Sequence, residues 1–254
     1  MAKTYQNKIQ IRLKQALIKS YSQYIYRLTF DKMKKIAVIV AGGTGLRMGA
    51  FIPKQFLILK GKPILWYTLN TFLEAYDDLQ IVLVLPEEHI ERGKGLLETL
   101  NGKDRVNIVK GGITRFHSVQ NGLAQITGDT IVFVHDGVRC LVSKRLIQNC
   151  YEQALEKGSA IPAVAATDSI RIVDGDKSSV TDRNHIRIIQ TPQTFRSNII
   201  LPAFKQEYSN TFTDEATVVE ASGINIHLIE GDYNNIKITR PADLLVAETI
   251  LQEL

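Results

Sequence analysis

The chain of 254 residues is 44% hydrophobic and 22% charged, the composition of an ordinary globular protein rather than of a fibre or a disordered chain. Its apolar runs, such as IAVIVAGG and IVLVLP, are shorter than the ~18 residues that a membrane-spanning helix needs. Two cysteines, Cys140 and Cys150, form no CxxC pattern and are too few for the disulfide framework of a small secreted domain. We therefore expect a cytoplasmic protein.

The positive charge is concentrated at the N-terminus. The formal net charge is +5, but residues 1–34 contain eight Lys or Arg and one acid, a net of +7, which leaves −2 for the other 220 residues. The body of the chain is thus mildly acidic. This distribution argues against a nucleic-acid-binding face on the main domain.

Residues 1–33 form a basic N-terminal extension. Leucine and tyrosine recur in it at helical spacing with cations between them, a pattern compatible with a membrane-surface helix or a transit segment. The alternative is a weakly ordered extension, with Met33 as the natural start before KKIAVIVAGG. We favour the alternative, because no secretory cleavage pattern follows, and we expect residues 34–254 to form a single domain.

From residue 35 onward, short β-branched runs alternate with segments of helical period. The predicted strands are 35–41, 80–85, 106–109, 130–135, 159–165 and 225–230, and the predicted helices are 63–76, 87–100, 114–126, 143–157, 197–207, 214–222 and 241–253. Several strands are apolar at successive positions, as expected where helices cover both faces of a sheet. The sequence therefore predicts an α/β fold, with a mostly parallel, doubly wound (Rossmann-like) sheet flanked by helices.

Residues 168–195 break this alternation. Two strand-like halves flank the turn-rich DGDKSS and show no helical period, which predicts a projecting β-hairpin. An isolated hairpin is barely stable in water. We therefore expect this arm, at about 168–192, to pack on a second copy of the chain in a homodimer.

The predicted first strand runs directly into a glycine-rich turn, AGGTGLRMG. Glycine tolerates positive φ and lets backbone N–H groups approach a phosphate chain, at the strand end where open α/β sheets bind ligands. No GK[ST] follows, and Met48 stands where a GxGxxG fingerprint needs its third glycine. Arg47 and Lys54 flank the turn, where fixed cations stabilise the charge that builds as pyrophosphate leaves a triphosphate.

Asp136 ends a predicted strand in VFVHDG, where a lone carboxylate is either a helix cap or a metal ligand. Mg²⁺ takes only one or two protein carboxylates and keeps several waters, so a single Asp suffices. The adjacent His135 has no Cys or His partner at metal-site spacing, and we interpret it as a packed histidine. In GGITRFHS, a strand end followed by a helix start, Thr114 and Ser118 are candidate cap or surface residues.

Six blocks of the sequence closely resemble the 2-C-methyl-D-erythritol 4-phosphate cytidylyltransferase family, in order and at the expected spacing. They cover essentially all of residues 34–254 and are AGGTGLRMGAFIPKQF, GGITRFHSVQNGL, VFVHDGVRC, VTDRNHIRIIQTPQTF, FTDEATVVEASG and EGDYNNIKITRPADL. The resemblance implies an enzyme of non-mevalonate isoprenoid precursor synthesis. It would join a sugar-alcohol phosphate to CMP taken from CTP and release pyrophosphate.

The resemblance also implies a role for individual residues. The nucleotide-binding residues would be Ala41, Gly42, Gly43, Thr44, Gly45, Gly112 and Ser118. The catalytic cations, which stabilise the transition state or position the attacking phosphate, would be Arg47, Lys54, Arg183 and Lys237. The acceptor contacts would be Asp136, Arg139, Ser169, Thr191 and Thr213, with Asp136 also the ligand of Mg²⁺. In the family, the arm that carries Ser169 and Arg183 reaches across a dimer to the neighbour's site.

Three residues depart from the family pattern. Cys140 stands where proline is usual, Ser169 stands where threonine is expected, and Asn234 replaces a common acidic residue. The first two changes remove no chemistry. The third puts in doubt an auxiliary carboxylate near Lys237.

The implied nucleophile needs no general base, because a phosphate monoester with a second pKa near 6 is largely dianionic at neutral pH. Two other functions stay open. A ribitol 5-phosphate cytidylyltransferase has a very similar loop, although TDRN and TDEA match the methylerythritol family better, and a non-catalytic nucleotide-binding protein would share the same turn. A nicotinamide-dependent oxidoreductase is disfavoured, because the predicted second strand ends in Leu85 and Pro86 instead of an acid.

Overall fold

The structure, a computed structural model, describes residues 33–43 and 52–253. The chain divides into two units, Met1–Met33 and Lys34–Leu254, and the elements named below belong to the second. The predicted N-terminal extension, apart from Met33, lies outside the described residues, and so do Thr44, Gly45 and Arg47. In the described ranges, no helix is long and apolar enough to span a bilayer.

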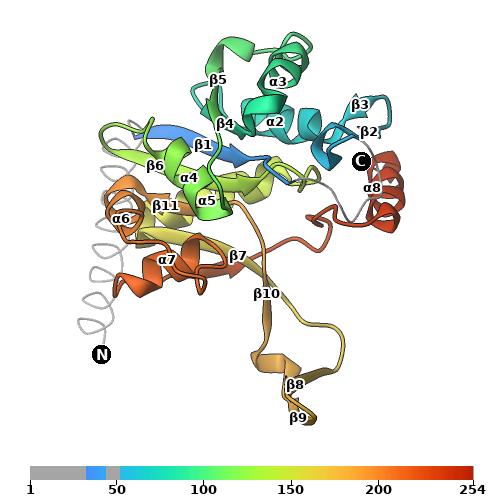
Figure 1. The fold of residues 1–254 in the computed structure, drawn as a ribbon, viewed down its shortest axis with the longest axis vertical. Helices are drawn as coiled ribbons and strands as arrows, with labels where there is room; N and C mark the ends of the chain where they lie inside the picture. Colours follow the sequence, from blue (N-terminus) through green and yellow to red (C-terminus); the bar gives the residue numbers. More distant parts are fainter. Residues whose placement is uncertain (1–32, 44–51, 254) are drawn as a thin grey trace, which may run out of the picture. The chain divides into compact units, whose positions relative to one another are not determined.

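One mixed sheet forms the centre of the second unit (Figure 1). Its strands are β1 (Lys34–Val40), β4 (Gln80–Leu85), β5 (Val106–Lys110), β6 (Thr130–Asp136), β7 (Ser159–Ala165), β10 (Arg187–Ile189), β11 (Gln193–Arg196) and β12 (Leu228–Glu230). They lie in the order β10-β7-β11-β6-β1-β4-β5, and β12 pairs with β7. β1 pairs in parallel with β4 and β6, and β4 pairs in parallel with β5. The carboxyl ends of these four strands therefore meet at one edge of the sheet.

Helices cover both faces of the sheet. On one face α2 (Ile64–Ala75) packs beside α5 (Lys144–Lys157), and Phe72 of α2 lies edge-on to Phe133 of β6 with ring centroids 6.1 Å apart. The other face carries α4 (Arg115–Leu123), α6 (Ser197–Ala203) and α7 (Glu215–Ala221), whose apolar side chains form one cluster with the strands. The other helical elements of the described residues are α3 (Ile90–Leu97), α8 (Pro241–Glu253) and the 3₁₀ turns η2 (Lys54–Phe56), η3 (Glu87–His89), η4 (Lys103–Arg105) and η5 (Arg183–His185).

The central strands are apolar at successive positions because both of their faces are covered. Every residue of β6 is buried, including the polar pair at its end, His135 and Asp136. Buried polar groups need partners to offset their desolvation. The end of β6 is therefore a place where the fold must supply hydrogen bonds and countercharges.

The predicted α/β class is confirmed, and each predicted strand and helix is present. The ends of β4, β7 and α8 are those predicted, and the other elements have shifted ends. The segment predicted as a helix over 87–100 begins as the short turn η3 before α3. A two-stranded hairpin, β2 (Ile58–Leu59) with β3 (Lys62–Pro63), had no counterpart in the predicted elements. Lys60 and Gly61 connect its strands with φ of +46° and +82°, the paired positive φ values that a type I′ turn requires.

The prediction of one hairpin over 168–195 was wrong in its extent. The hairpin consists only of β8 (Ile170–Asp174) and β9 (Lys177–Thr181), which extend away from the main sheet (Figure 1). The rest of the segment returns to the main sheet, where β10 and β11 run antiparallel to β7, and β11 also to β6. Alternating residues indicate a strand but do not reveal whether its partner is the neighbouring segment or a distant one.

Candidate active site

A cavity of about 590 Å³ opens at the carboxyl ends of β1, β4 and β6. This volume is within the range of small-molecule sites, and the location is the one at which open α/β sheets bind ligands. The cavity brings together eight of the residues predicted for the site, namely Ala41, Gly42, Gly43, Lys54, Gly112, Ser118, Asp136 and Lys237. Thr44, Gly45 and Arg47 lie outside the described residues.

The described part of the glycine turn is tied to η2. The side chain of Gln55 is fully buried and donates a hydrogen bond to the backbone oxygen of Ala41 at 2.8 Å. The preceding side chain, Lys54, lies over the turn, because a methyl group placed on Gly43 would be 3.0 Å from its Cε and 3.7 Å from its Nζ. The lysine ammonium and the backbone of the turn therefore face the same part of the cavity.

Gly112 and Ser118 form one unit at the start of α4. The Ser118 hydroxyl accepts a hydrogen bond from the Gly112 N–H at 3.1 Å. Gly112 has no room for a side chain, because a Cβ there would lie 2.4 Å from Cβ of His117. Thr114 is the helix cap, since its hydroxyl accepts from the backbone N–H of His117 at 3.3 Å. The structure thus assigns the cap to Thr114 and leaves Ser118 on the cavity wall.

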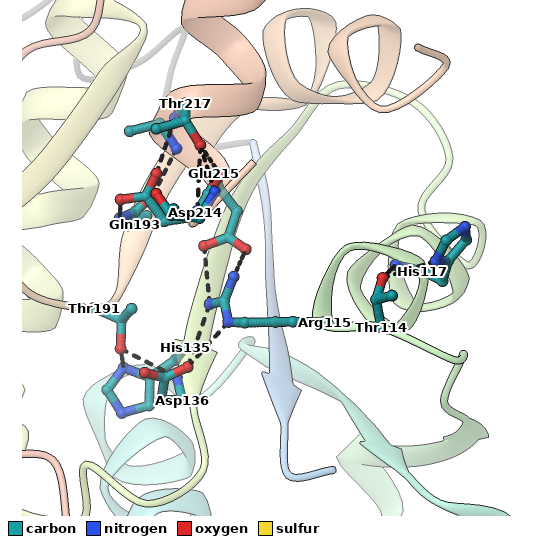
Figure 2. Close-up of polar contacts among 12 residues, drawn as sticks. Thr114, Arg115, His117, His135, Asp136, Thr191, Gln193, Asp214, Glu215 and Thr217 are labelled. Atoms are coloured by element: carbon teal, nitrogen blue, oxygen red, sulfur yellow. Dashed lines mark hydrogen bonds and ion pairs between the residues drawn. The ribbon is translucent and has the colours of Figure 1, made fainter. Parts of the chain in front are cut away.

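Asp136 is surrounded by cations. Its Oδ2 lies 2.9 Å from Nζ of Lys237 and 3.7 Å from Nε of Arg139. Its Oδ1 lies 3.3 Å from Nη2 of Arg115 (Figure 2). Burial alone raises the pKa of this carboxyl, but the charges of Arg115 and Lys237 outweigh burial and hold the pKa of Asp136 well below its ordinary value. Asp136 is therefore ionised at neutral pH.

His135 and Thr191 fix the backbone beside this carboxylate. Nε2 of His135 lies 3.2 Å from the backbone oxygen of Arg139, which can only accept, so Nε2 carries the proton of the neutral ring. Nδ1 then accepts from the Thr191 hydroxyl at 3.0 Å, and this hydroxyl accepts from the N–H of Asp136 at 3.1 Å (Figure 2). Burial lowers the pKa of His135 to about 3. His135 is thus a packed, neutral histidine, as interpreted from the sequence.

Arg139 joins β6 to the segment before α8. Its Nη1 donates to the backbone oxygen of Asn235 at 2.8 Å, and Asn235, fully buried, donates to the backbone oxygen of Thr191 at 2.8 Å. Nε of Arg139 is buried and has no hydrogen-bond partner among the described residues. The same segment carries Lys237, whose half-exposed side chain reaches the cavity.

The other predicted acceptor contacts do not line this cavity. Thr213 lies just before α7, where its N–H donates to the hydroxyl of Thr217 at 3.1 Å. Ser169 and Arg183 lie at the base of the β8–β9 hairpin and are exposed, and Nη1 of Arg183 donates to the backbone oxygen of Thr167 at 2.6 Å. Within one protomer, the fold therefore does not bring Ser169 and Arg183 to the lining of the cavity.

Two charged residues at the site were missed by the sequence analysis. Arg115 lines the cavity and bridges Asp136 to Glu215, a buried carboxylate at the start of α7 (Figure 2). Arg115 lies in the family-like block GGITRFHSVQNGL and Glu215 in FTDEATVVEASG, but 100 positions separate the two residues. The one local signal is the placement of Arg115 in the first turn of a helix, where the helix dipole disfavours a cation.

Comparison with known proteins agrees with this geometry. The family model described as 2-C-methyl-D-erythritol 4-phosphate cytidylyltransferase (IspD) matches residues 35–253. The chain is 44% identical over 219 residues to the protein of that name from Phocaeicola vulgatus, covering 86% of this chain and 100% of the relative. It is also 44% identical over 221 residues to that of Porphyromonas gingivalis (strain ATCC 33277), covering 87% and 99%.

Solved structures give the same result. The 4-diphosphocytidyl-2C-methyl-D-erythritol synthase of Anaerococcus prevotii superposes with a TM-score of 0.76 at 28% identity, over 88% of this chain and 98% of that one. The 2-C-methyl-D-erythritol 4-phosphate cytidylyltransferase of Francisella tularensis superposes with a TM-score of 0.70 at 33% identity, over 85% and 99%. The chain therefore belongs to the 2-C-methyl-D-erythritol 4-phosphate cytidylyltransferase family.

Proposed function

We propose that the chain transfers CMP from CTP to 2-C-methyl-D-erythritol 4-phosphate, forming 4-CDP-2-C-methyl-D-erythritol and pyrophosphate in non-mevalonate isoprenoid precursor synthesis. The observation that carries the proposal is that one cavity joins a glycine turn with a lysine over it to a buried aspartate ringed by cations. The turn suits a triphosphate, and the cations suit an incoming phosphate. The family match over residues 35–253 supports these substrates.

The nucleotide occupies the side of the cavity formed by the turn and α4. The backbone of residues 41–45 cradles the triphosphate, and Arg47 and Lys54 stabilise the pentacoordinate transition state. Gly112 and Ser118 contact cytosine and ribose. The place of both residues in the cavity lining, where the Ser118 hydroxyl accepts from the Gly112 N–H, supports this role.

The acceptor phosphate binds near the end of β6. One of its oxygens attacks the α-phosphorus of CTP, and the bond from that phosphorus to the bridging β-oxygen breaks, so that pyrophosphate leaves with the bonding electrons. Lys237 and Arg139 hold the attacking phosphate, and their positions beside Asp136, at 2.9 Å and 3.7 Å from its Oδ2, support this role. Because the phosphate is already ionised at neutral pH, the chain supplies position and charge but no base. Contacts from Thr191 and Thr213 to the acceptor stay a prediction from the resemblance, because neither residue lines the cavity.

Asp136 is the proposed protein ligand of Mg²⁺. Its donor chemistry fits, since it is an ionised carboxylate on the cavity wall and Mg²⁺ needs only one or two such groups beside phosphate oxygens and water. In residues 33–43 and 52–253, no three His, Cys, Asp or Glu side chains gather closely enough to hold a metal ion. Substrate oxygens and water would complete the shell. When bound, Mg²⁺ neutralises charge on the triphosphate oxygens.

The β8–β9 hairpin is the proposed dimer arm. It exposes Ile172, Val173 and Val180 by 58%, 70% and 77%, and a two-stranded hairpin with exposed apolar side chains is barely stable alone. We propose that it packs on a second copy and brings Ser169 and Arg183 to the partner's acceptor site.

The domain boundaries stay a proposal, with a basic extension over 1–33 and a single domain over 34–254. The cytoplasmic location is also a proposal. Cys140 and Cys150 are buried and unpaired, and burial raises the pKa of each thiol to about 12. Free thiols of this kind support a reducing compartment.

The test is pyrophosphate release from CTP, ATP, GTP and UTP, each with methylerythritol phosphate or with ribitol 5-phosphate. The proposal predicts release with CTP and methylerythritol phosphate above all other pairs. Faster release with ribitol 5-phosphate would favour the other cytidylyltransferase. Nucleotide binding without release from any pair would instead identify a non-catalytic protein.

A further inference from the structure

Arg115 stands between two carboxylates at the cavity. Its Nε and Nη2 lie 3.4 Å and 3.3 Å from Oδ1 of Asp136, and its Nη1 and Nη2 contact both carboxylate oxygens of Glu215, with 3.1 Å between Nη2 and Oε2 (Figure 2). A cation in the first turn of a helix opposes the helix dipole, so α4 gains nothing from it. The two carboxylates account for its position.

Glu215 grips the guanidinium through two parallel contacts, the geometry that orients an arginine best. Its side chain is 1% exposed, whereas that of Arg115 is 32% exposed. Burial raises the pKa of the Glu215 carboxyl, and the charge of Arg115 opposes this rise. Glu215 therefore touches no solvent-filled part of the site and reaches it only through Arg115.

The start of α7 is fixed to the main sheet. Asp214 and Thr217 form a capping box, in which the Asp214 side chain accepts from the Thr217 N–H at 2.9 Å. Gln193 of β11 donates to Oδ2 of Asp214 at 2.9 Å and accepts from the N–H of Ala216 at 2.8 Å. Gln193 is also the partner of Val134 in the ladder with β6. Glu215 and the end of β6 consequently belong to one rigid frame, with Arg115 between them.

Stability alone does not explain this arrangement. A buried ion pair is on average no more stabilising than apolar side chains of the same volume. This pair lies against the cavity and contacts the carboxylate that the proposed reaction uses. A network that orients a ligand or metal-binding group has this form, and its loss typically costs 10–100-fold in affinity or activity.

We propose that Glu215 is a positioning residue for nucleotidyl transfer, which acts through Arg115 to hold Asp136 in its working orientation. This inference rests on the proposed function. With Glu215 in place, the guanidinium of Arg115 is shared between the two carboxylates, and it faces Oδ1 of Asp136 in one fixed orientation. Without the charge of Glu215, the guanidinium is free to turn fully toward Asp136 or toward a bound triphosphate, and Asp136 loses its fixed orientation.

The test uses Glu215→Gln, Arg115→Gln and the double variant that combines these two changes. The matched control is Glu220→Gln, which changes an exposed glutamate of the same helix as Glu215. Turnover is measured with varied acceptor and saturating CTP, and CTP affinity is measured separately by calorimetry without Mg²⁺. The proposal predicts that Glu215→Gln lowers kcat/KM for the acceptor by about 10–100-fold, with CTP affinity close to that of the parent. Because the two residues act as a unit, the double variant should lose little more than the worse single variant.

Arg115→Lys guards against a failure to fold. Its ammonium keeps the charge beside Glu215, but it cannot present the fork that spans both carboxylates. It should keep a melting temperature near that of the parent and lose a similar factor in kcat/KM for the acceptor.

Three results would overturn the inference. The first is equal kinetics for Glu215→Gln and Glu220→Gln. The second is a loss of kcat/KM in the double variant that equals the product of the losses in the two single variants. The third is a loss of CTP affinity in Glu215→Gln as large as its loss of kcat/KM for the acceptor. A parent chain that releases no pyrophosphate would instead contradict the proposed function, whatever the variants do.

Discussion

Nζ of Lys237 lies 2.9 Å from Oδ2 of Asp136, and this ion pair joins the segment before α8 to the end of β6. The lysine side chain is 41% exposed and the aspartate side chain 10%, so the ammonium stands on the open side of the pair. An anion that enters the cavity meets the ammonium before the carboxylate.

Lys237→Met should weaken use of the acceptor. Removal of a cation that positions the attacking phosphate is expected to lower kcat/KM for the acceptor by about 100-fold, with CTP affinity little changed. Steady-state kinetics with each substrate varied in turn measures both effects. The matched control is Lys205→Met at an exposed position after α6. Equal kinetics for the two variants would remove Lys237 from the acceptor site.

Lys54→Met should act mainly on kcat. If its ammonium beside the glycine turn stabilises the leaving pyrophosphate, its loss costs about 10²–10³ in kcat, as for one transition-state donor. Single-turnover rates with prebound CTP measure the chemical step directly. Lys60→Met, in the β2–β3 turn, is the control. Near-normal turnover of Lys54→Met would count against its assignment.

Gly112→Ala should damage both folding and nucleotide binding. The new Cβ would lie 2.4 Å from Cβ of His117 and 2.9 Å from its backbone carbon, and overpacking of this kind costs about 1–3 kcal/mol. Gly95→Ala is the control, because that Cβ meets nothing within 4 Å and alanine favours the helix. Urea titrations should show a lower free energy of unfolding for Gly112→Ala and a slightly higher one for Gly95→Ala. CTP affinity should fall only for Gly112→Ala.

His135 should make the protein less stable in acid. Its pKa is about 3 in the folded chain and ~6.5 when unfolded, so between these values only the unfolded chain binds the proton. Stability therefore falls as the pH is lowered through this window, by up to about 1.4 kcal/mol per pH unit from this group. Asp136, with its depressed pKa, acts in the same direction at lower pH, and Glu215, with its raised pKa, acts in the opposite direction.

His135→Gln should consequently lose less stability than the parent between pH 6.5 and pH 5, in urea titrations at each pH. His185→Gln, at an exposed position in η5, should behave like the parent. If the free energy of unfolding changed equally with pH in His135→Gln and in the parent, His135 would not be a neutral, buried group in the folded chain.

The parts of the fold that sequence predicts are those with a local cause. β1 and β6 are recognisable because burial on both faces makes their central residues apolar at successive positions, and the turn after β1 is recognisable from its glycines. β11 is a polar run, QTFR, that follows Pro192, so nothing local indicates that it inserts between β6 and β7.

The same distinction holds at the site. Asp136 is predictable, because it is a carboxylate at the end of a buried strand. The bridge from Arg115 to Glu215 is not, since it depends on two helix starts that only the complete sheet brings together. The assignment of Arg183 and Ser169 to the site rests on the resemblance alone and stays a prediction, because no contact within one protomer brings them to the cavity.

In the proposed reaction, an oxygen of the ionised acceptor phosphate forms the new bond to the α-phosphorus that comes from CTP, and the chain supplies position and charge. The most direct measurement is mass spectrometry of the products formed from CTP and an acceptor whose three non-bridging phosphate oxygens are ¹⁸O. Bond formation by an acceptor phosphate oxygen predicts that the cytidylylated product retains all of the label and that pyrophosphate carries none. Label in pyrophosphate, or its loss to water during turnover, would contradict the claim.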